Sequence, residues 1–421
     1  MTEIKEKSTS KKLSTVGRAF RSRNYRLYFF GQGVSLIGTW MQNVALSWLV
    51  YRLTGSAFML GVIGFITQTP MMILTPLTGV LADRWNRYRV MIATQVSMMI
   101  LALALAILVL THWIAMWQII VIGLGFGVAN ALDAPTRHSF IVQLVDNRED
   151  ISNAIALNSA MFNSARLIGP SVAGLLIAWL GEGACFLFNA FSFLAVIFAL
   201  LAMRITAQDM IPTAQKSIFR ELKEGFLYTF RSKPIRLTLL HFAFVALLGM
   251  SFTVLLPILA TEILHGDARS LGFLLGALGV GALLGSILMA ARKDNAGLWK
   301  ITAMSSTIFG LGLIALSMSR SLIISLFLMV ITGFGMVTIM TASNTFLQTN
   351  IEDGKRARVM AFYLLAFFGT VPVGNLITGS IGDIIGVPTT ILLAGIFSLV
   401  VSLVFTLKFS NCTKQSPPVC R

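Results

Sequence analysis

Charged residues are scarce in this chain. Asp, Glu, Lys and Arg make up 12% of its 421 residues, against roughly 25% in an ordinary soluble domain. They are absent from four long stretches, residues 27–51, 53–82, 90–132 and 271–291. A helix needs about 20 mostly apolar residues to cross a bilayer, and a charge at the bilayer centre is costly. The scarcity therefore excludes a soluble globular protein and predicts a protein that crosses the membrane many times.

Cysteine is also rare, and the motifs of common catalytic chemistry are missing. Cys185, Cys412 and Cys420 do not form a disulfide framework or a metal site. The sequence has no Walker A loop and no H-E-x-x-H or G-x-S-x-G motif. It has no RNA-binding signature, although its net charge is +16. We therefore expect no enzyme, no nucleic-acid partner, and no metal or other cofactor.

The apolar stretches resolve into twelve predicted transmembrane helices, which makes the chain an all-α membrane protein. Because the count is even, both termini lie on one side. The spans are predicted near residues 27–51, 56–82, 90–110, 113–133, 153–180, 183–203, 238–262, 271–291, 301–319, 321–348, 359–381 and 386–407.

The basic residues gather on one side of this topology. The N-terminal segment, the loop after the second span and the central loop hold most of the Lys and Arg, whereas the opposite side has only Arg52, Arg269 and Arg320. The positive-inside rule then places both termini in the cytoplasm. We expect the basic N-terminus to attract anionic lipid headgroups.

A polar central loop divides the chain into two halves of six spans. Within it, residues 219–228 have apolar positions at helical spacing and are expected to lie on the membrane surface. The predicted parts are a cytoplasmic basic segment, an N-terminal half, a linker, a C-terminal half and a cytoplasmic tail, over residues 1–26, 27–203, 204–237, 238–408 and 409–421.

Short glycine patterns recur in the two halves. Gly125-Phe126-Gly127 in the fourth span returns as Gly333-Phe334-Gly335 in the tenth, and Gly169 and Gly174 in the fifth return as Gly374 and Gly379 in the eleventh. Each match alone is weak, but together they indicate a duplicated six-helix unit. Two such halves with a site between them form a transporter architecture.

Polar side chains inside the spans are the candidates for substrate contact. Arg166 is the one formal charge that we place deep in the membrane, and Asn163 lies one turn before it. Such an arginine either binds a cargo or bonds helix carbonyls in a structural role. Polar stripes on the first and tenth spans and one aromatic ring complete the predicted set, because polar faces turn away from lipid. These residues are Gln32, Thr39, Asn43, Asn344, Gln348 and Tyr363.

The loop after the second span carries the sharpest motif, Gly79-Val-Leu-Ala-Asp83-Arg84-Trp-Asn-Arg87-Tyr-Arg89. It resembles the loop signature of the major facilitator superfamily, G-x-x-x-D-R-x-G-R-R. We interpret Gly79, Asp83, Arg84 and Arg87 as a cytoplasmic latch, with Asp133 within reach of the arginines. Asp83 suits the N-terminal amides of a neighbouring helix.

Two further segments narrow the resemblance, over about residues 20–408. Asp133-Ala-Pro135-Thr-Arg137 with Gly169-Pro170, and Ser343-Asn344-Thr345 with Pro372-Val-Gly374, resemble the branch of enterobactin exporters and macrolide-efflux proteins. The resemblance implies a secondary active transporter of the bacterial inner membrane that exports an amphipathic small molecule, a siderophore or a drug-like compound, by alternating access. Twelve spans with an internal cavity require no partner, so we expect a monomer. Gly169-Pro170 also resembles part of an antiporter signature.

The direction of transport and its energy source stay open at this stage. An importer of a siderophore or a lysophospholipid transporter would use the same fold. Span interiors hold no carboxylate, so Asp133 at a span end and His241 near the start of the seventh span are the candidates for proton coupling. The arginine that many proton-coupled relatives carry in the fourth span is missing, and Gln118 lies near its position.

Overall fold

The computed structural model describes residues 17–82, 86–204, 226–292, 294 and 296–415, and helix is the only regular structure in this part of the chain. A short 3-10 turn (Arg18–Arg21) precedes the N-terminal half, and two more (Val142–Leu144 and Arg148–Asp150) follow α5. The long helices of this half are α2 (Arg23–Thr54), α3 (Ala57–Ala82), α4 (Arg87–Leu110), α5 (Met116–Ile141), α6 (Ile151–Leu180) and α7 (Glu182–Ala202).

The C-terminal half repeats this plan with two irregular members. Its first span is a chain of short segments, α9 (Lys233–Phe244), the π-helical turn η4 (Val245–Gly249), the 3-10 helix η5 (Met250–Leu255), α10 (Leu256–Ile258) and the π-helical turn η6 (Leu259–Ile263). The others are α11 (Ala268–Ala291), α12 (Leu298–Met318), α13 (Leu322–Asn350), α14 (Asp353–Phe368) with α15 (Val371–Ile385), and α16 (Val387–Gln415).

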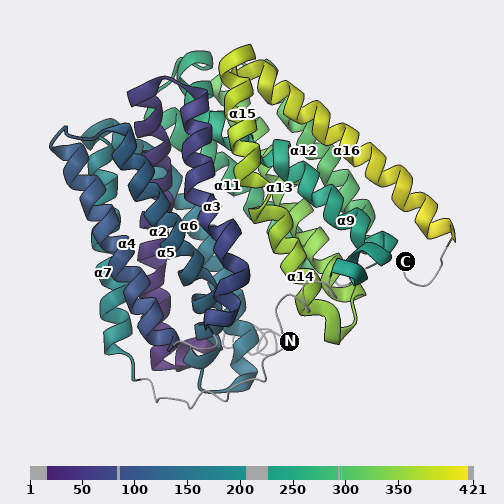
Figure 1. Cartoon of the computed structure of the whole chain (residues 1–421), viewed down its shortest axis with the longest axis horizontal. Helices are drawn as coiled ribbons and strands as arrows, with labels where there is room; N and C mark the ends of the chain where they lie inside the picture. Colours follow the sequence, from purple (N-terminus) through teal and green to yellow (C-terminus); the bar gives the residue numbers. More distant parts are fainter. Residues whose placement is uncertain (1–16, 83–85, 205–225, 293, 295, 416–421) are drawn as a thin grey trace, which may run out of the picture.

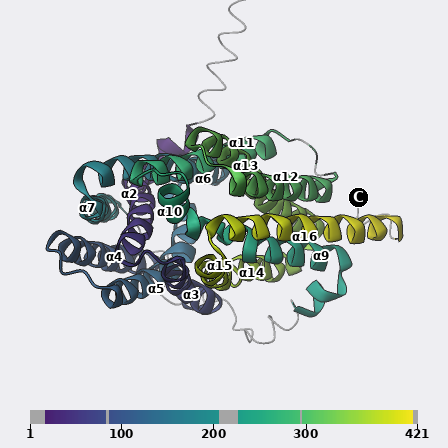
Figure 2. The same ribbon diagram turned by 90° about the horizontal axis from the view of Figure 1, so that it is seen from above.

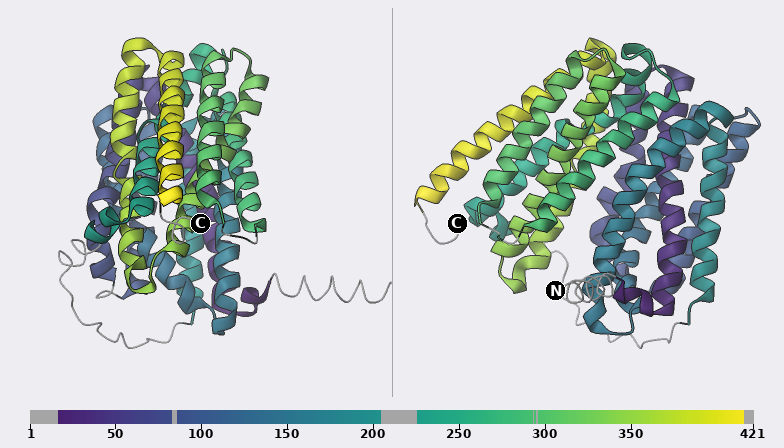
Figure 3. Two further views of the ribbon diagram at one scale, coloured as in Figure 1. Left: turned by 90° about the vertical axis from the view of Figure 1, so that its right-hand side faces the viewer. Right: turned by 180° about the vertical axis from the view of Figure 1, so that it is seen from behind.

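The two halves lie side by side and meet at one end only (Figure 1). The helix axes diverge towards the other end, where the chain termini lie, and the view from behind shows the same V shape (Figure 3). Seen from above, α3 with α15 and α6 with α11 form the junction between the halves (Figure 2). We call the joined end the closed end and the other the terminal end.

Glycine-to-glycine contacts join the halves at the closed end. A Cβ on Gly174 of α6 would lie 3.0 Å from the Cα of Gly272 on α11. A Cβ on Gly61 of α3 would lie 3.1 Å from the Cα of Gly379 on α15. Since lipid is as apolar as leucine, membrane helices associate through such close packing rather than through a hydrophobic gain. The junction therefore depends on glycine at these positions, because glycine has no side chain to hold the helices apart.

The recurring glycines have equivalent roles, which confirms the predicted duplication. Gly169 packs against Trp40 on the first helix of its own half, and Gly374 packs against Leu247 on the first span of the other half. Gly174 and Gly379 each contact the second helix of the opposite half. The two six-helix halves are therefore structural repeats.

The G-F-G match between the fourth and tenth spans is two residues out of register. Gly333 packs against Leu278 on α11, the second helix of its half, and Gly335 against Phe309 on α12, the third. In the N-terminal half Gly123 and Gly127 both face the second helix, beside Thr67, and Gly125 between them faces the third, beside Leu101. The contacts repeat in both halves, but the two G-F-G tripeptides do not occupy equivalent positions.

Two predicted spans are not continuous α-helices. The seventh contains π-helical and 3-10 segments, and the eleventh is interrupted between Phe368 and Val371. Proline explains part of both changes, because Pro257 and Pro372 cannot donate the amide hydrogen bond that a regular helix needs at their positions. The irregular segments pack together, with the Ser251 hydroxyl 3.4 Å from the Val371 carbonyl.

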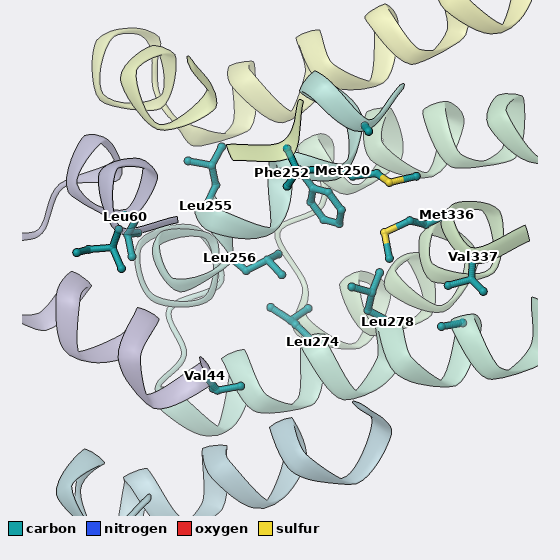
Figure 4. Close-up of a cluster of buried hydrophobic side chains, with 14 of the residues drawn as sticks. Val44, Leu60, Met250, Phe252, Leu255, Leu256, Leu274, Leu278, Met336 and Val337 are labelled. Atoms are coloured by element: carbon teal, nitrogen blue, oxygen red, sulfur yellow. The ribbon is translucent and has the colours of Figure 1, made fainter. Parts of the chain in front are cut away.

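An apolar cluster crosses the junction. Figure 4 shows Val44 and Leu60 of the N-terminal half in one buried cluster with Leu255, Leu256 and Leu274 of the C-terminal half. All five side chains are nearly inaccessible to solvent. The closed end is thus a packed core between the halves.

Eleven stretches of the described residues are long and apolar enough to span a membrane. The remaining long helix, α2, has 32 residues but carries Arg23 and Arg26 and the polar stripe, which lower its hydropathy. For the predicted surface helix, residues 219–225 lie outside the described part, and residues 226–231 are helical. There Phe226 packs on Phe362 of α14, with 6.2 Å between ring centroids.

We predict that Gly281→Ala destabilises the protein while Gly33→Ala does not. A Cβ on Gly281 would collide with the Val330 backbone carbonyl, whereas one on Gly33 would make an ordinary contact with Met161. Alanine favours a helix by about 1 kcal/mol over glycine, but overpacking costs about 1–3 kcal/mol. Thermal unfolding in detergent should show a lower midpoint for Gly281→Ala alone. Equal midpoints for both variants would contradict this account of the packing.

Candidate functional site at the junction of the halves

Arg166 lies on α6 where the two halves meet. Pro170, four residues later, has no amide hydrogen, so the Arg166 carbonyl lacks its usual partner within the helix. A Cβ on Gly279 of α11 would lie 3.1 Å from this carbonyl oxygen, and only glycine leaves that space open. The backbone at Arg166 therefore contacts the other half directly.

The Arg166 guanidinium faces an aromatic ring rather than a carboxylate. Its Cζ lies 5.7 Å from the centre of the Trp40 ring on α2, within the range of a cation–π interaction. Within the described part of the chain, no hydrogen-bond acceptor or carboxylate pairs with it. The side chain is half-buried, so its charge is neither neutralised nor fully hydrated. Such a group suits an anionic ligand, because the planar guanidinium binds carboxylates with two parallel hydrogen bonds.

Part of the predicted substrate set lies within one helical turn of Arg166 or Trp40. Asn163 lies one turn towards the terminal end, and its amide donates to the Ser159 carbonyl at 2.9 Å. Thr39 precedes Trp40 and donates to the Ser35 carbonyl. Asn43 is exposed one turn from Trp40. With Phe162, which meets the Trp40 ring edge-on at 5.8 Å, these residues give the site mixed polar and aromatic walls.

The other predicted residues lie nearer the terminal end. Gly281 of α11 contacts Val330 of α13, so Arg166 is roughly level with residue 330. Asn344 follows along the same helix by about 20 Å, given a rise of 1.5 Å per residue. Its amide oxygen accepts from Gln348 at 2.5 Å. These two residues do not join Arg166 in one compact site.

Two members of the set are buried in this conformation. Tyr363 is 5% exposed, stacks on Phe242 with 4.6 Å between ring centroids, and donates to the Met340 carbonyl at 3.0 Å. Gln32 is 2% exposed, and its Oε1 has no hydrogen-bond partner. Both therefore pack within their halves here, and their contact with a substrate stays a prediction.

Asp133 is held in a buried polar cluster of the N-terminal half. Its carboxylate accepts from Thr94 at 3.1 Å and from Gln95 at 2.9 Å, both on α4. The Arg137 guanidinium, one turn later on α5, pairs with it at 3.6 Å. We also predict that an arginine of the loop after the second span reaches this carboxylate. Arg84 lies outside the described residues, so its contact with Asp133 stays a prediction, as does that of Arg87.

The remaining predicted residues divide into two groups. Asp83 and Arg84 of the latch motif lie outside the described residues, while α3 continues through Gly79 and α4 begins at Arg87. His241 is 3% exposed in the C-terminal half. Its ring packs on Phe405 with 4.4 Å between ring centroids, and neither ring nitrogen has a hydrogen-bond partner.

Two junction residues were absent from the predicted set. Asn375 of α15 is 2% exposed and lies against Gly61 and Gly64 of α3. Asp383 near the end of α15 bonds to the first turn of α3. The sequence feature that could have pointed to both residues is their position, one helical turn from the repeated glycine Gly379.

Comparison with known proteins agrees with this architecture. A family model described as transmembrane secretion effector matches residues 15–416. The chain is 22% identical to the staphyloferrin A transporter of Staphylococcus aureus, over 90% of this chain and 94% of the relative. It is 21% identical to macrolide efflux protein A of Streptococcus pyogenes (90% and 96% covered) and 23% identical to the multidrug efflux pump Tap of Mycolicibacterium fortuitum (87% and 91% covered).

Solved structures show the same fold at lower sequence identity. A transporter of the POT family in complex with 5-aminolevulinic acid superposes with a TM-score of 0.76 at 14% identity, covering 94% of this chain and 97% of that one. A bacterial homologue of the lysosomal transporter Spinster, in an inward-facing and unoccupied conformation, gives 0.73 at 15% identity, covering 94% and 99%.

The paired six-helix repeats, the match over nearly the whole chain and the bacterial relatives lead to one family. The protein is a multi-pass secondary transporter of the plasma membrane whose relatives move siderophores and drugs. The chain belongs to the transmembrane secretion effector family of the major facilitator superfamily.

Proposed function

We propose that this transporter exports an anionic amphipathic small molecule, a siderophore or a drug-like compound, from the cytoplasm. The observation that carries the proposal is the unpaired Arg166 guanidinium over Trp40 at the junction of the halves. A carboxylate-bearing cargo would satisfy the cation while its apolar part contacts Trp40 and Phe162. The siderophore and macrolide relatives support cargo of this size and polarity.

The shape of the molecule and the predicted orientation support the first step of an export cycle. The basic residues place both termini in the cytoplasm, so the terminal end, where the halves diverge, faces the cytoplasm (Figure 1). In this state Arg166 is offered to cytoplasmic cargo while the packed closed end blocks the outer side. Rocking of the halves about the junction then releases the cargo outside. The transporter acts as a monomer, because one chain supplies both halves.

We propose Asp133 rather than His241 as the proton-coupling group. The Asp133 carboxylate forms an ion pair with Arg137, so protonation of Asp133 would release a charged partner and change contacts between α4 and α5. The His241 ring instead packs on Phe405 within the C-terminal half, where no described carboxylate stabilises its charged form. The motif of Gly79, Asp83, Arg84 and Arg87 serves as a latch at the terminal end once the halves have rocked.

We predict that Arg166→Ala lowers the affinity for an anionic cargo by roughly 10–100-fold, because a charge-assisted hydrogen bond is worth about 1.5–3 kcal/mol. Arg166→Lys should recover part of it, since an ammonium keeps the charge but not the planar fork. Binding to the purified protein measures both, with Arg320→Ala at the distant α12–α13 turn as the control. Normal binding with poor expression of both Arg166 variants would show a structural role instead.

We predict that a strain lacking this protein retains the cargo inside the cell. Culture supernatant and cell contents, grown under iron limitation, would be compared by untargeted mass spectrometry. A compound that accumulates in the cells and is missing outside confirms export and names the cargo. A compound left unused in the medium would instead mean import, and the proposal would be wrong in its direction.

We predict that Asp133→Asn abolishes uptake driven by a pH gradient in inside-out vesicles but keeps exchange of labelled for unlabelled cargo. The amide preserves the size of the side chain and removes the charge that pairs with Arg137. His241→Phe should retain both activities, because the ring only packs on Phe405. Loss of driven uptake in His241→Phe with normal uptake in Asp133→Asn would reverse the assignment.

A further inference from the structure

The first turn of α3 is capped by a carboxylate from the other half of the protein. The Ala57 amide donates to Oδ1 of Asp383 at 2.6 Å, and the Ser56 hydroxyl donates to Oδ2 at 2.7 Å. The first amides of a helix have no acceptor within the helix, and the helix dipole makes this end positive. A carboxylate placed there is therefore favourable on both counts.

This contact exists only because α3 and α15 touch at the closed end. A Cβ on Gly382, next to Asp383, would lie 3.1 Å from the Ala57 side chain, and Gly61 meets Gly379 one turn further in. If the halves separate at this end, Asp383 moves away from α3 with its own helix. The Ala57 amide then loses its acceptor.

The equivalent helix of the C-terminal half is capped differently. The first turn of α11 is capped by Asp267, the residue directly before it, which accepts from the Arg269 amide at 2.9 Å and from the Ser270 amide at 3.4 Å. That cap lies within one half and is kept whether the halves are joined or apart. The two repeats therefore differ in one respect. The bonds from α3 to Asp383 require the halves to be joined, whereas the Asp267 cap of α11 does not.

We propose that Asp383 and the first turn of α3 form a latch that holds the closed end shut. It would act with a second contact across the junction, in which the Tyr51 hydroxyl donates to the Glu262 carboxylate at 3.2 Å. The inference rests on the alternating access of the proposed function, since a latch matters only if this end opens. Asp83 comes directly after α3 in the sequence, and Asp383 lies near the end of α15. Each of these antiparallel helices therefore has an aspartate at or near its C-terminal end in the sequence.

The test measures the distance between the halves at the closed end. Spin labels on cysteines at Thr111, in the α4–α5 turn, and Arg320, in the α12–α13 turn, report this distance by pulsed electron resonance in lipid nanodiscs. Both positions are exposed and belong to different halves. The three native cysteines are first replaced by alanine. No cargo is added, so the measurement is independent of what the protein transports.

We expect Asp383→Ala to raise the ratio of long to short distances by about fivefold or more, since a helix cap with its charge typically shifts an equilibrium by that factor. Asp383→Asn should give a smaller rise, because its amide oxygen still accepts but the charge is gone. Asp267→Ala, the matched cap within one half, should leave the distribution as in the wild type. If Asp383→Ala does not fold, Ser56→Ala removes one of the two bonds, together with the local bond from the Met59 amide to the same hydroxyl, and should give a partial rise.

A distribution unchanged by Asp383→Ala, or changed equally by Asp267→Ala, overturns the latch. These outcomes are separate from failure of the proposed function. An exporter with normal transport and unaltered distances would contradict the latch alone. A protein that opens on loss of Asp383 but moves no anionic cargo would support the latch and contradict the cargo assignment.

Discussion

Close contact between glycine backbones is the constraint on which this structure depends. In lipid, two apolar helices gain little by hiding their side chains from the solvent, so packing must come from surfaces that approach closely. Gly174 against Gly272 and Gly61 against Gly379 provide that approach at the two crossings between the halves. Both crossings lie at one end, and the halves diverge from there (Figure 3). The position of the glycines along the helices thus decides which end is closed.

The same constraint explains how much the sequence could predict. The span positions follow from hydropathy, and the structure has helix at all twelve. The fourth and twelfth helices run eight residues beyond the predicted ends, to Ile141 and Gln415, because hydropathy does not report where a helix continues past the lipid. The duplication was visible because Gly169 and Gly174 must recur wherever their contacts recur. The register of the G-F-G match could not be predicted. Gly123 and Gly125 are the same residue type two positions apart, and only the structure shows which helix each one faces. The interruptions near Pro257 and Pro372 depend on packing between two distant spans, which periodicity does not report.

The sequence predicted which types of residue form the candidate site better than it predicted their contacts. Arg166 could be selected from the sequence because a charge deep in a span is rare, but its partner could not. Trp40 lies more than a hundred residues earlier and meets Arg166 only because Gly169 lets α2 and α6 pack closely. Asn344 and Gln348 share a polar stripe with the right character, yet they lie along α13 towards the terminal end. A polar stripe shows which face of a helix turns away from lipid. How far a residue on that face lies from Arg166 depends on how the neighbouring helices pack.

One helical turn links the Arg166 guanidinium to the junction. Pro170 frees the Arg166 carbonyl, and that carbonyl lies against Gly279 of the opposite half, while the side chain of the same residue faces Trp40. Any ligand that pulls the guanidinium from Trp40 therefore acts on the segment of α6 that contacts α11. The contact has no side chain on the α11 face to absorb a shift, so movement of this turn is passed to the helix as a whole. If Arg166 binds cargo as we propose, binding and the joining of the halves are mechanically coupled through this residue, without a separate relay between them.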